Sequence, residues 1–323
     1  MRDNRRIPDF FIVGHPKCGT TALYEMLRRH PQVFMPEMKE PWFFAAELLR
    51  NLPSVSAGIP VDVPETLDQY LSLFQKAKPE QVVGEATALY LWSRVAARGI
   101  ARLQPAARII AVFREPASFL RSLHLELVRR HQEPEKDLRT AIFAEEARRQ
   151  GNYVPPSAWY WPTIVLYSDY MRYVEQLRRY QELFPPEQIL VLIYDDFRDD
   201  NETTIRTVQR FLGVDDAHPI DTVEANPTVR VRSTYLNNLL GAISTGAGPV
   251  SGAAKTVIET LTSEQLRQKA LRTAQRRLIY AKPEPHDDEL MIELRRRYKS
   301  EAVALSEYLG RDLVTLWGYD EID

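Results

Sequence analysis

The segment from Asp9 to His30 constrains the fold most, because a short apolar run is followed by two spaced glycines and a helical pattern. The run from Phe10 to Val13 is typical of a buried strand that ends at Gly14. Residues 20–30 then predict an amphipathic helix with three apolar side chains on one face, Leu23, Met26 and Leu27. The start of a helix offers unpaired N–H groups and the positive end of the helix dipole. The segment therefore predicts a strand, an anion-binding loop and a helix.

Three further apolar runs predict strands at residues 81–85, 108–113 and 188–194. Helical patterns alternate with these runs, near residues 65–77, 91–103, 116–130, 168–182 and 200–212. Strands that alternate with helices favour a parallel sheet covered on both faces. We therefore expect an α/β fold.

The chain has 323 residues, which suits one large domain or two smaller ones. We find no internal repeat and predict a single domain over residues 1–323, with its core at about 9–215. A helical apolar pattern between His286 and Asp312 predicts a helical C-terminal part. Residues 241–254 are rich in small side chains and are expected to form a mobile loop.

Bulk composition narrows the possible partners and the compartment. Lys and Arg total 42 against 44 Asp and Glu, so net charge does not favour a nucleic-acid partner. The single cysteine excludes an intramolecular disulfide and suits a reducing cytosol. The charged N-terminus lacks a signal-peptide pattern, and no apolar stretch is long enough to cross a bilayer. We therefore expect a cytoplasmic protein without a membrane partner.

The first loop differs from a nucleotide-hydrolysing P-loop in the position of its lysine. Gly14 and Gly19 have the P-loop spacing GxxxxGK[ST], but Thr20 follows the second glycine where that motif has lysine. The only lysine of the loop, Lys17, lies before Gly19 and is placed for an anion at the loop mouth. Thr21 adds a second hydroxyl donor.

The segment from Pro16 to Leu23 resembles the 5′-phosphosulfate loop of PAPS-dependent sulfotransferases, whose usual form is Pro-Lys-Ser/Gly-Gly-Thr-Thr/Ser. The resemblance implies a P-loop-like three-layer fold with a central, mostly parallel sheet of about five strands. It also implies that PAPS is the donor and PAP the product, and that no metal is required. The residues it assigns to the 5′ end of the donor are Pro16, Lys17, Cys18, Gly19, Thr20, Thr21 and Ala22.

A second donor motif follows the predicted strand at residues 108–113. Arg114 ends this strand, a proline follows two residues later, and Ser122 lies eight residues after the arginine, as in the family's 3′-phosphate motif. A guanidinium at the carboxyl edge of a strand can bind phosphate through two hydrogen bonds. The family's late basic loop is matched more loosely, by Arg230 and Arg232.

Sulfuryl transfer needs positive charge on the sulfate oxygens and a base for the acceptor proton. Lys17 is expected to supply the charge. Glu40 precedes a Trp-Phe-Phe run, which is similar to the base segment of heparan-type sulfotransferases. Glu85 ends the strand at 81–85 and resembles a glutamate that acts as base in other members, although Ala86 replaces the usual lysine. Glu40 and Glu85 both remain candidate bases.

The acceptor is expected to be a small molecule, such as a natural product, or a glycan that offers a hydroxyl or an amine. Candidate residues for its binding are mostly aromatic: Trp42, Phe44, Trp159, Tyr160 and, on the helix after Ser122, His124. No cluster has zinc-ligand spacing, and no acidic motif suits magnesium. Two alternatives stay open, a P-loop kinase or NTPase and a non-catalytic nucleotide-binding scaffold. The protein is expected to be a monomer or a homodimer.

Overall fold

The computed structural model describes residues 6–49, 63–130, 132–152, 163–221, 230–231, 280–281 and 287–322. A parallel five-stranded sheet forms its centre, in the order β2-β3-β1-β4-β5. The strands are β1 (Phe10–Ile12), β2 (Val33–Phe34), β3 (Val82–Ala86), β4 (Arg108–Phe113) and β5 (Ile189–Ile193). This architecture confirms the predicted α/β fold and its strand number.

Close packing within the sheet depends on a glycine beside the first strand. Phe10 of β1 pairs with Gly84 of β3, and a Cβ atom at Gly84 would lie 2.1 Å from Phe10 Cζ and 2.5 Å from Met35 Sδ. All three residues of β1 are fully buried. The strand that carries the anion-binding loop is therefore held in the middle of the core.

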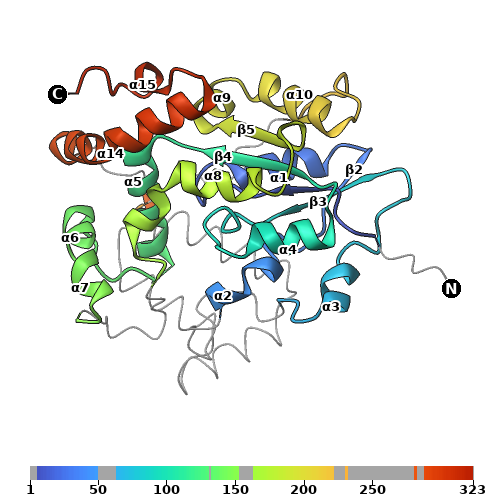
Figure 1. Cartoon of the computed structure of the whole chain (residues 1–323), viewed down its shortest axis with the longest axis horizontal. Coiled ribbons are helices and arrows are strands. Elements are labelled where there is room, and N and C mark those ends of the chain that lie inside the picture. Colours follow the sequence, from blue (N-terminus) through green and yellow to red (C-terminus); the bar gives the residue numbers. More distant parts are fainter. Residues whose placement is uncertain are drawn as a thin grey trace.

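Helices cover both faces of the sheet, and Figure 1 shows α10 and α4 on opposite sides of it. The helices that surround the sheet are α1 (Thr20–Arg28), α3 (Leu67–Ser72), α4 (Ala96–Leu103), α5 (Pro116–Arg129), α8 (Tyr173–Gln181), α9 (Tyr194–Asp199) and α10 (Asn201–Leu212). Shorter elements are the 3-10 turns η1 (Phe43–Ala45), η2 (Tyr167–Met171) and η3 (Pro186–Gln188) and the helices α2 (Ala46–Leu49), α6 (Leu138–Phe143) and α7 (Glu145–Arg149).

The C-terminal part is helical, as predicted, with α14 (Asp288–Leu309) and α15 (Leu313–Leu316). Helix α14 packs against α5 and α8. Beyond α15, the Tyr319 hydroxyl donates to Glu115 Oε1 at 2.8 Å, and Trp317 Nε1 donates to Asp195 Oδ2 at 3.0 Å. Glu115 and Asp195 follow the carboxyl ends of β4 and β5, so the C-terminal part supports that edge of the sheet.

The strand β2 and the helices α6, α7 and α9 have no counterpart among the elements predicted from sequence. Strand β2 has only two residues, too short for a periodic pattern, and its pairing with β3 defines it. A small antiparallel pair joins β6 (Arg230–Val231) to β7 (Tyr280–Ala281), and β6 lies beside α5. The predicted mobile loop at 241–254 lies outside the described residues, and the single-domain organisation stays a prediction.

Candidate active site

The loop between β1 and α1 adopts backbone conformations that open it toward the carboxyl edge of the sheet. Lys17 has φ +62° and Gly19, which caps α1, has φ +83°, so both lie in the left-handed region. A Cβ atom at Gly19 would lie 2.9 Å from Phe197 Cδ1, so glycine is required for conformation and for space. The loop thus presents backbone N–H groups at the start of a helix, as an anion site requires.

The buried side chain of His15 anchors this loop. It is fully buried, and its Nε2 donates to Gln176 Oε1 at 2.7 Å. Burial lowers the pKa of His15 to about 3, so the ring is neutral at physiological pH. His15 therefore fixes the loop position and supplies no charge to the site.

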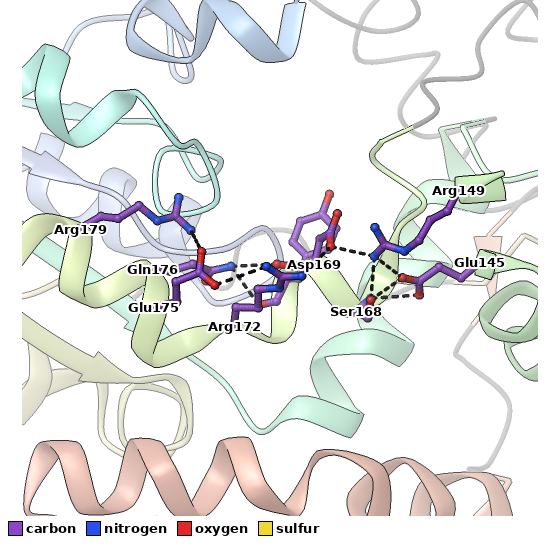
Figure 2. A network of polar contacts seen from close by, with 9 residues as sticks. Glu145, Arg149, Ser168, Asp169, Arg172, Glu175, Gln176 and Arg179 are labelled. Carbon is purple, nitrogen blue, oxygen red and sulfur yellow. Dashed lines mark hydrogen bonds and ion pairs between the residues drawn. The ribbon is translucent and has the colours of Figure 1, made fainter. Parts of the chain in front are cut away.

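Gln176 belongs to a polar network along η2 and α8 (Figure 2). Its Nε2 donates to the Asp169 carbonyl oxygen at 3.0 Å, and Asp169 also accepts from Arg149 Nη2 at 2.8 Å. The network continues through Arg172 to Glu175. Through Gln176, the loop between β1 and α1 is thereby tied to η2 and α8.

A pocket opens in front of Lys17. Helix α1 and its loop form one side, the Glu40 turn and the segment after β3 form another, and α5 forms a third. The lining residues are Pro16, Lys17, Thr20, Thr21, Glu40, Trp42, Ala88, Leu89, Leu123, Glu126, Leu127, Arg130, Gln132 and Ile164. The predicted lysine and one predicted base, Glu40, are thus brought together.

Lys17 is largely buried, with 8% of its side chain exposed. Its Nζ lies 3.7 Å from Glu126 Oε2. Burial lowers the pKa of Lys17, and the Glu126 carboxylate opposes this shift. The ammonium therefore faces the pocket with an acidic partner beside it.

Glu40 lies on a strained turn. Its φ is +62°, its N–H donates to the Ala86 carbonyl oxygen at 3.0 Å, and its Oε1 accepts from Lys39 Nζ at 2.5 Å. Burial opposes ionisation, but the Lys39 charge and hydrogen bond hold the pKa of Glu40 below its usual range. Backbone strain at a non-glycine residue is common at functional sites. Glu40 is therefore an ionised carboxylate in the pocket wall.

Glu85 lies one residue before the end of β3 and is fully buried. Its Oε2 accepts from the Tyr70 hydroxyl at 3.0 Å and its Oε1 from the Thr87 hydroxyl at 2.6 Å. Burial raises the pKa of Glu85 to about 7, although these hydrogen bonds oppose the shift. Glu85 is not among the residues that line the pocket.

Arg114 joins the two predicted donor motifs directly. Its Nη1 donates to the Lys17 carbonyl oxygen at 2.9 Å, and its guanidinium carbon lies 4.4 Å from the centre of the Tyr194 ring. The Arg114 carbonyl oxygen accepts from the Tyr173 hydroxyl at 2.9 Å. The following residue, Glu115, caps α5 through the Ala117 and Ser118 N–H groups. The guanidinium is therefore held beside the loop mouth.

Comparison with known proteins identifies the family to which this chain belongs. A family model described as sulfotransferase domain matches residues 7–267. The chain belongs to the sulfotransferase family.

Among solved structures, a sulfotransferase from Alicyclobacillus acidocaldarius is 28% identical with a TM-score of 0.59, covering 81% of this chain and 99% of that one. Mouse carbohydrate sulfotransferase 15 is 30% identical over 38% of this chain and 27% of its own length. Human bifunctional heparan sulfate N-deacetylase/N-sulfotransferase 3 is 29% identical over 65% of this chain and 22% of its own length. This chain thus spans about a quarter of these curated relatives.

Several residues that the sequence predicts for donor or acceptor binding are buried in the core. Cys18 is fully buried, and burial raises the pKa of its thiol to about 12, so it is poorly reactive. Phe44 packs edge-on against Phe11, Tyr70 and Tyr90. Ser122 is buried on α5, one turn before Glu126.

His124 lies in a buried polar network. Its Nδ1 is 2.9 Å from the Tyr167 hydroxyl, and its Nε2 is 3.0 Å from the Lys136 carbonyl oxygen. Tyr167 also donates to Glu133, which forms a fully buried ion pair with Arg148 at 2.7 Å. His124 does not line the pocket in front of Lys17.

The side chains of four other residues predicted to bind the donor or the acceptor are not described. Trp159, Tyr160 and Arg232 lie outside the described residues, and only the backbone of Arg230 is described, in β6 beside α5. Within the described ranges, no group of His, Cys, Asp and Glu could hold a metal ion. None of the described helices combines the length and the apolar character needed to cross a bilayer.

Sequence reasoning did not identify Glu126 and Arg130, which also line the pocket. The available signal was the spacing, since Glu126 follows Ser122 by four residues and residues four apart share a helical face.

Proposed function

We propose that this sulfotransferase moves a sulfuryl group from PAPS to a hydroxyl or amine of an acceptor and releases PAP. The observation that carries the proposal is a single pocket lined by both the Lys17 ammonium and the ionised Glu40 carboxylate. PAPS would supply an activated sulfuryl group on a phosphate leaving group. In-line displacement then depends on charge at the sulfate oxygens and on removal of the acceptor proton.

The donor assignment is supported by residues at two places. At the 5′ end, the loop from Pro16 to Ala22 has Lys17 and Gly19 in the left-handed region and leads into the start of α1, where backbone N–H groups suit an anion. At the 3′ end, Arg114 is fixed beside the loop, and Ser122 lies on the helix that follows. We assign the 3′-phosphate to Arg114 and Ser122, with β6 bringing the Arg230 backbone beside the same helix.

Lys17 places positive charge at the loop mouth and would stabilise the sulfate and leaving oxygens. Glu40 is the better placed base, because it lines the same pocket and is ionised at neutral pH. Glu85 has the pKa that suits a base, about 7, but it is buried and does not line the pocket. We therefore assign proton removal to Glu40. The end of β3 supports the Glu40 turn, because the Ala86 carbonyl oxygen accepts from the Glu40 N–H.

For the acceptor we propose a glycan or a small hydroxylated molecule. The two curated relatives are named for carbohydrate and heparan sulfate substrates, and Trp42, Leu89 and Ile164 give the pocket apolar surface. We also propose a reducing cytosol as the working compartment, since the single cysteine is a buried free thiol.

The donor is tested by thermal shift with PAP, ATP and GTP, followed by transfer of labelled sulfate from PAPS to a panel of glycans and hydroxylated small molecules without added metal. We expect PAP alone to stabilise the protein, in proportion to its concentration. Stabilisation by ATP with phosphate release would instead support a kinase or NTPase.

Lys17→Ala separates an enzyme from a non-catalytic scaffold. Its turnover should fall by about two to three orders of magnitude, as when an oxyanion donor is lost. Unchanged turnover in this variant would contradict the role of Lys17.

A further inference from the structure

We propose that Glu126 is a positioning residue that holds the Lys17 ammonium at the mouth of the donor loop and keeps it charged. The inference rests on the proposed function, because it gives Glu126 a role through the lysine that acts on the sulfuryl group. It concerns a side chain on α5 that neither donor motif includes.

The place of Glu126 on α5 is the first observation. Glu126 follows Ser122 by one helical turn, and its neighbours on that face, Leu123 and Leu127, also line the pocket. The same helix thus carries the proposed 3′-phosphate serine and a carboxylate that faces the loop. The contact with Lys17 joins two segments that are far apart in the sequence.

The fixed geometry of the carboxylate is the second observation. Arg129 Nε donates to Glu126 Oε2 at 3.0 Å, and Arg130 Nε donates to Glu126 Oε1 at 2.7 Å. Only 13% of the Glu126 side chain is exposed. Oε2, which accepts from Arg129, is also the atom that faces Lys17 Nζ at 3.7 Å. Two arginines therefore hold the carboxylate in the orientation that meets the lysine.

These cations also make Glu126 a weak base. Burial opposes its ionisation, but the hydrogen bonds and charge of Arg129, with the charges of Arg130 and Lys17, hold the pKa of Glu126 well below its usual range. A carboxylate that binds protons so weakly is a poor base at neutral pH. Its remaining effect is electrostatic, on Lys17.

Burial and three neighbouring guanidinium groups favour loss of the Lys17 charge, and the Glu126 carboxylate opposes them. Burial lowers the pKa of Lys17, and Arg129, Arg114 and Arg130 lower it further, whereas Glu126 raises it. Glu40 also lines this pocket. Without Glu126, the lysine would lie beside three guanidinium groups, and its pKa would fall.

The test compares Glu126→Gln with wild type in pH profiles of kcat and KM for PAPS. Gln keeps the shape but removes the charge, so we expect kcat to fall about tenfold, as for coupled neighbours. The alkaline limb of the profile should move to lower pH, and Glu126→Asp should restore part of both changes. Glu202→Gln is the matched control, because Glu202 also pairs with an arginine four residues on, Arg206; its profile should stay unchanged.

A double-mutant cycle separates this role from a structural one. In a Lys17→Ala background, Glu126→Gln should have no further effect on kcat. An equal loss in both backgrounds, or an unmoved alkaline limb, would overturn the proposal.

A titration of Lys17 by NMR, with ε-¹³C-labelled lysine assigned through Lys17→Ala, does not depend on activity. Its pKa should be lower in Glu126→Gln than in wild type, and an unchanged pKa would also overturn the inference. A protein that shows this shift but transfers no sulfate from PAPS would refute the proposed function and leave the positioning role intact.

Discussion

The two glutamates predicted as bases, Glu40 and Glu85, lie in contrasting environments. Glu40 lies on a strained turn at the pocket, where Lys39 holds its pKa low. Glu85 is fully buried near the end of β3, where desolvation raises its pKa to about 7. The Glu40 N–H donates to Ala86, the residue after Glu85, so the two regions are joined through the backbone.

This difference separates two properties of a general base, its affinity for a proton and its access to the pocket. Glu85 has a pKa near neutrality, which is favourable for proton transfer, but its carboxylate oxygens already accept from Tyr70 and Thr87. Glu40 is the weaker base but lines the same pocket as Lys17. Since a base must first reach the proton that it removes, position decides between them.

The largest expected effect comes from Glu40→Gln. Loss of a general base should lower kcat by about 10²- to 10⁴-fold, with little change in the affinity for PAP. Steady-state kinetics and a thermal-shift titration with PAP measure the two quantities. A Glu40→Gln enzyme with normal kcat would reverse the assignment in favour of Glu85.

Glu85→Gln should affect stability more than turnover. The folded-state pKa of Glu85 lies above the unfolded value, so the folded state binds more protons between about pH 4.5 and 7, and wild-type stability falls as pH rises through this range. The loss is on the order of 3 kcal/mol, from about 1.4 kcal/mol for each pKa unit. Urea unfolding at pH 5 and pH 8 measures it.

Glu85→Gln cannot ionise at this position, so its unfolding free energy should depend less on pH than that of wild type. Its kcat should fall less than that of Glu40→Gln. If the pH dependence is the same in both proteins, Glu85 is not the titrating group.

The smallest expected effect is that of Lys39→Gln. This change removes the cation that lowers the pKa of Glu40, so that pKa should rise. A base must be deprotonated to act, and the acid limb of the kcat profile should therefore move toward neutral pH. Activity at pH 8 should stay close to wild type, and an unmoved acid limb would argue that Glu40 is not the base.

Local sequence patterns determined the strand, loop and helix around Gly14 and Gly19 and most of the sheet. These patterns each span only a few residues, so they can be recognised without knowing the fold. They are the apolar run from Phe10 to Val13, the glycines at 14 and 19, and Lys17 between those glycines. The same holds for Arg114, which ends an apolar strand. Family membership and the α/β class followed from these segments.

Only the tertiary structure decided which distant side chains meet. The two-residue strand β2, the Lys17–Glu126 contact and the link between Tyr319 and Glu115 join segments far apart in the sequence. Burial also depends on packing from all sides, and it made Glu85 and Cys18 interior groups while Glu40 stayed at the pocket. Spacing along the chain specifies local geometry, whereas desolvation and charge pairing exist only once the whole chain has folded.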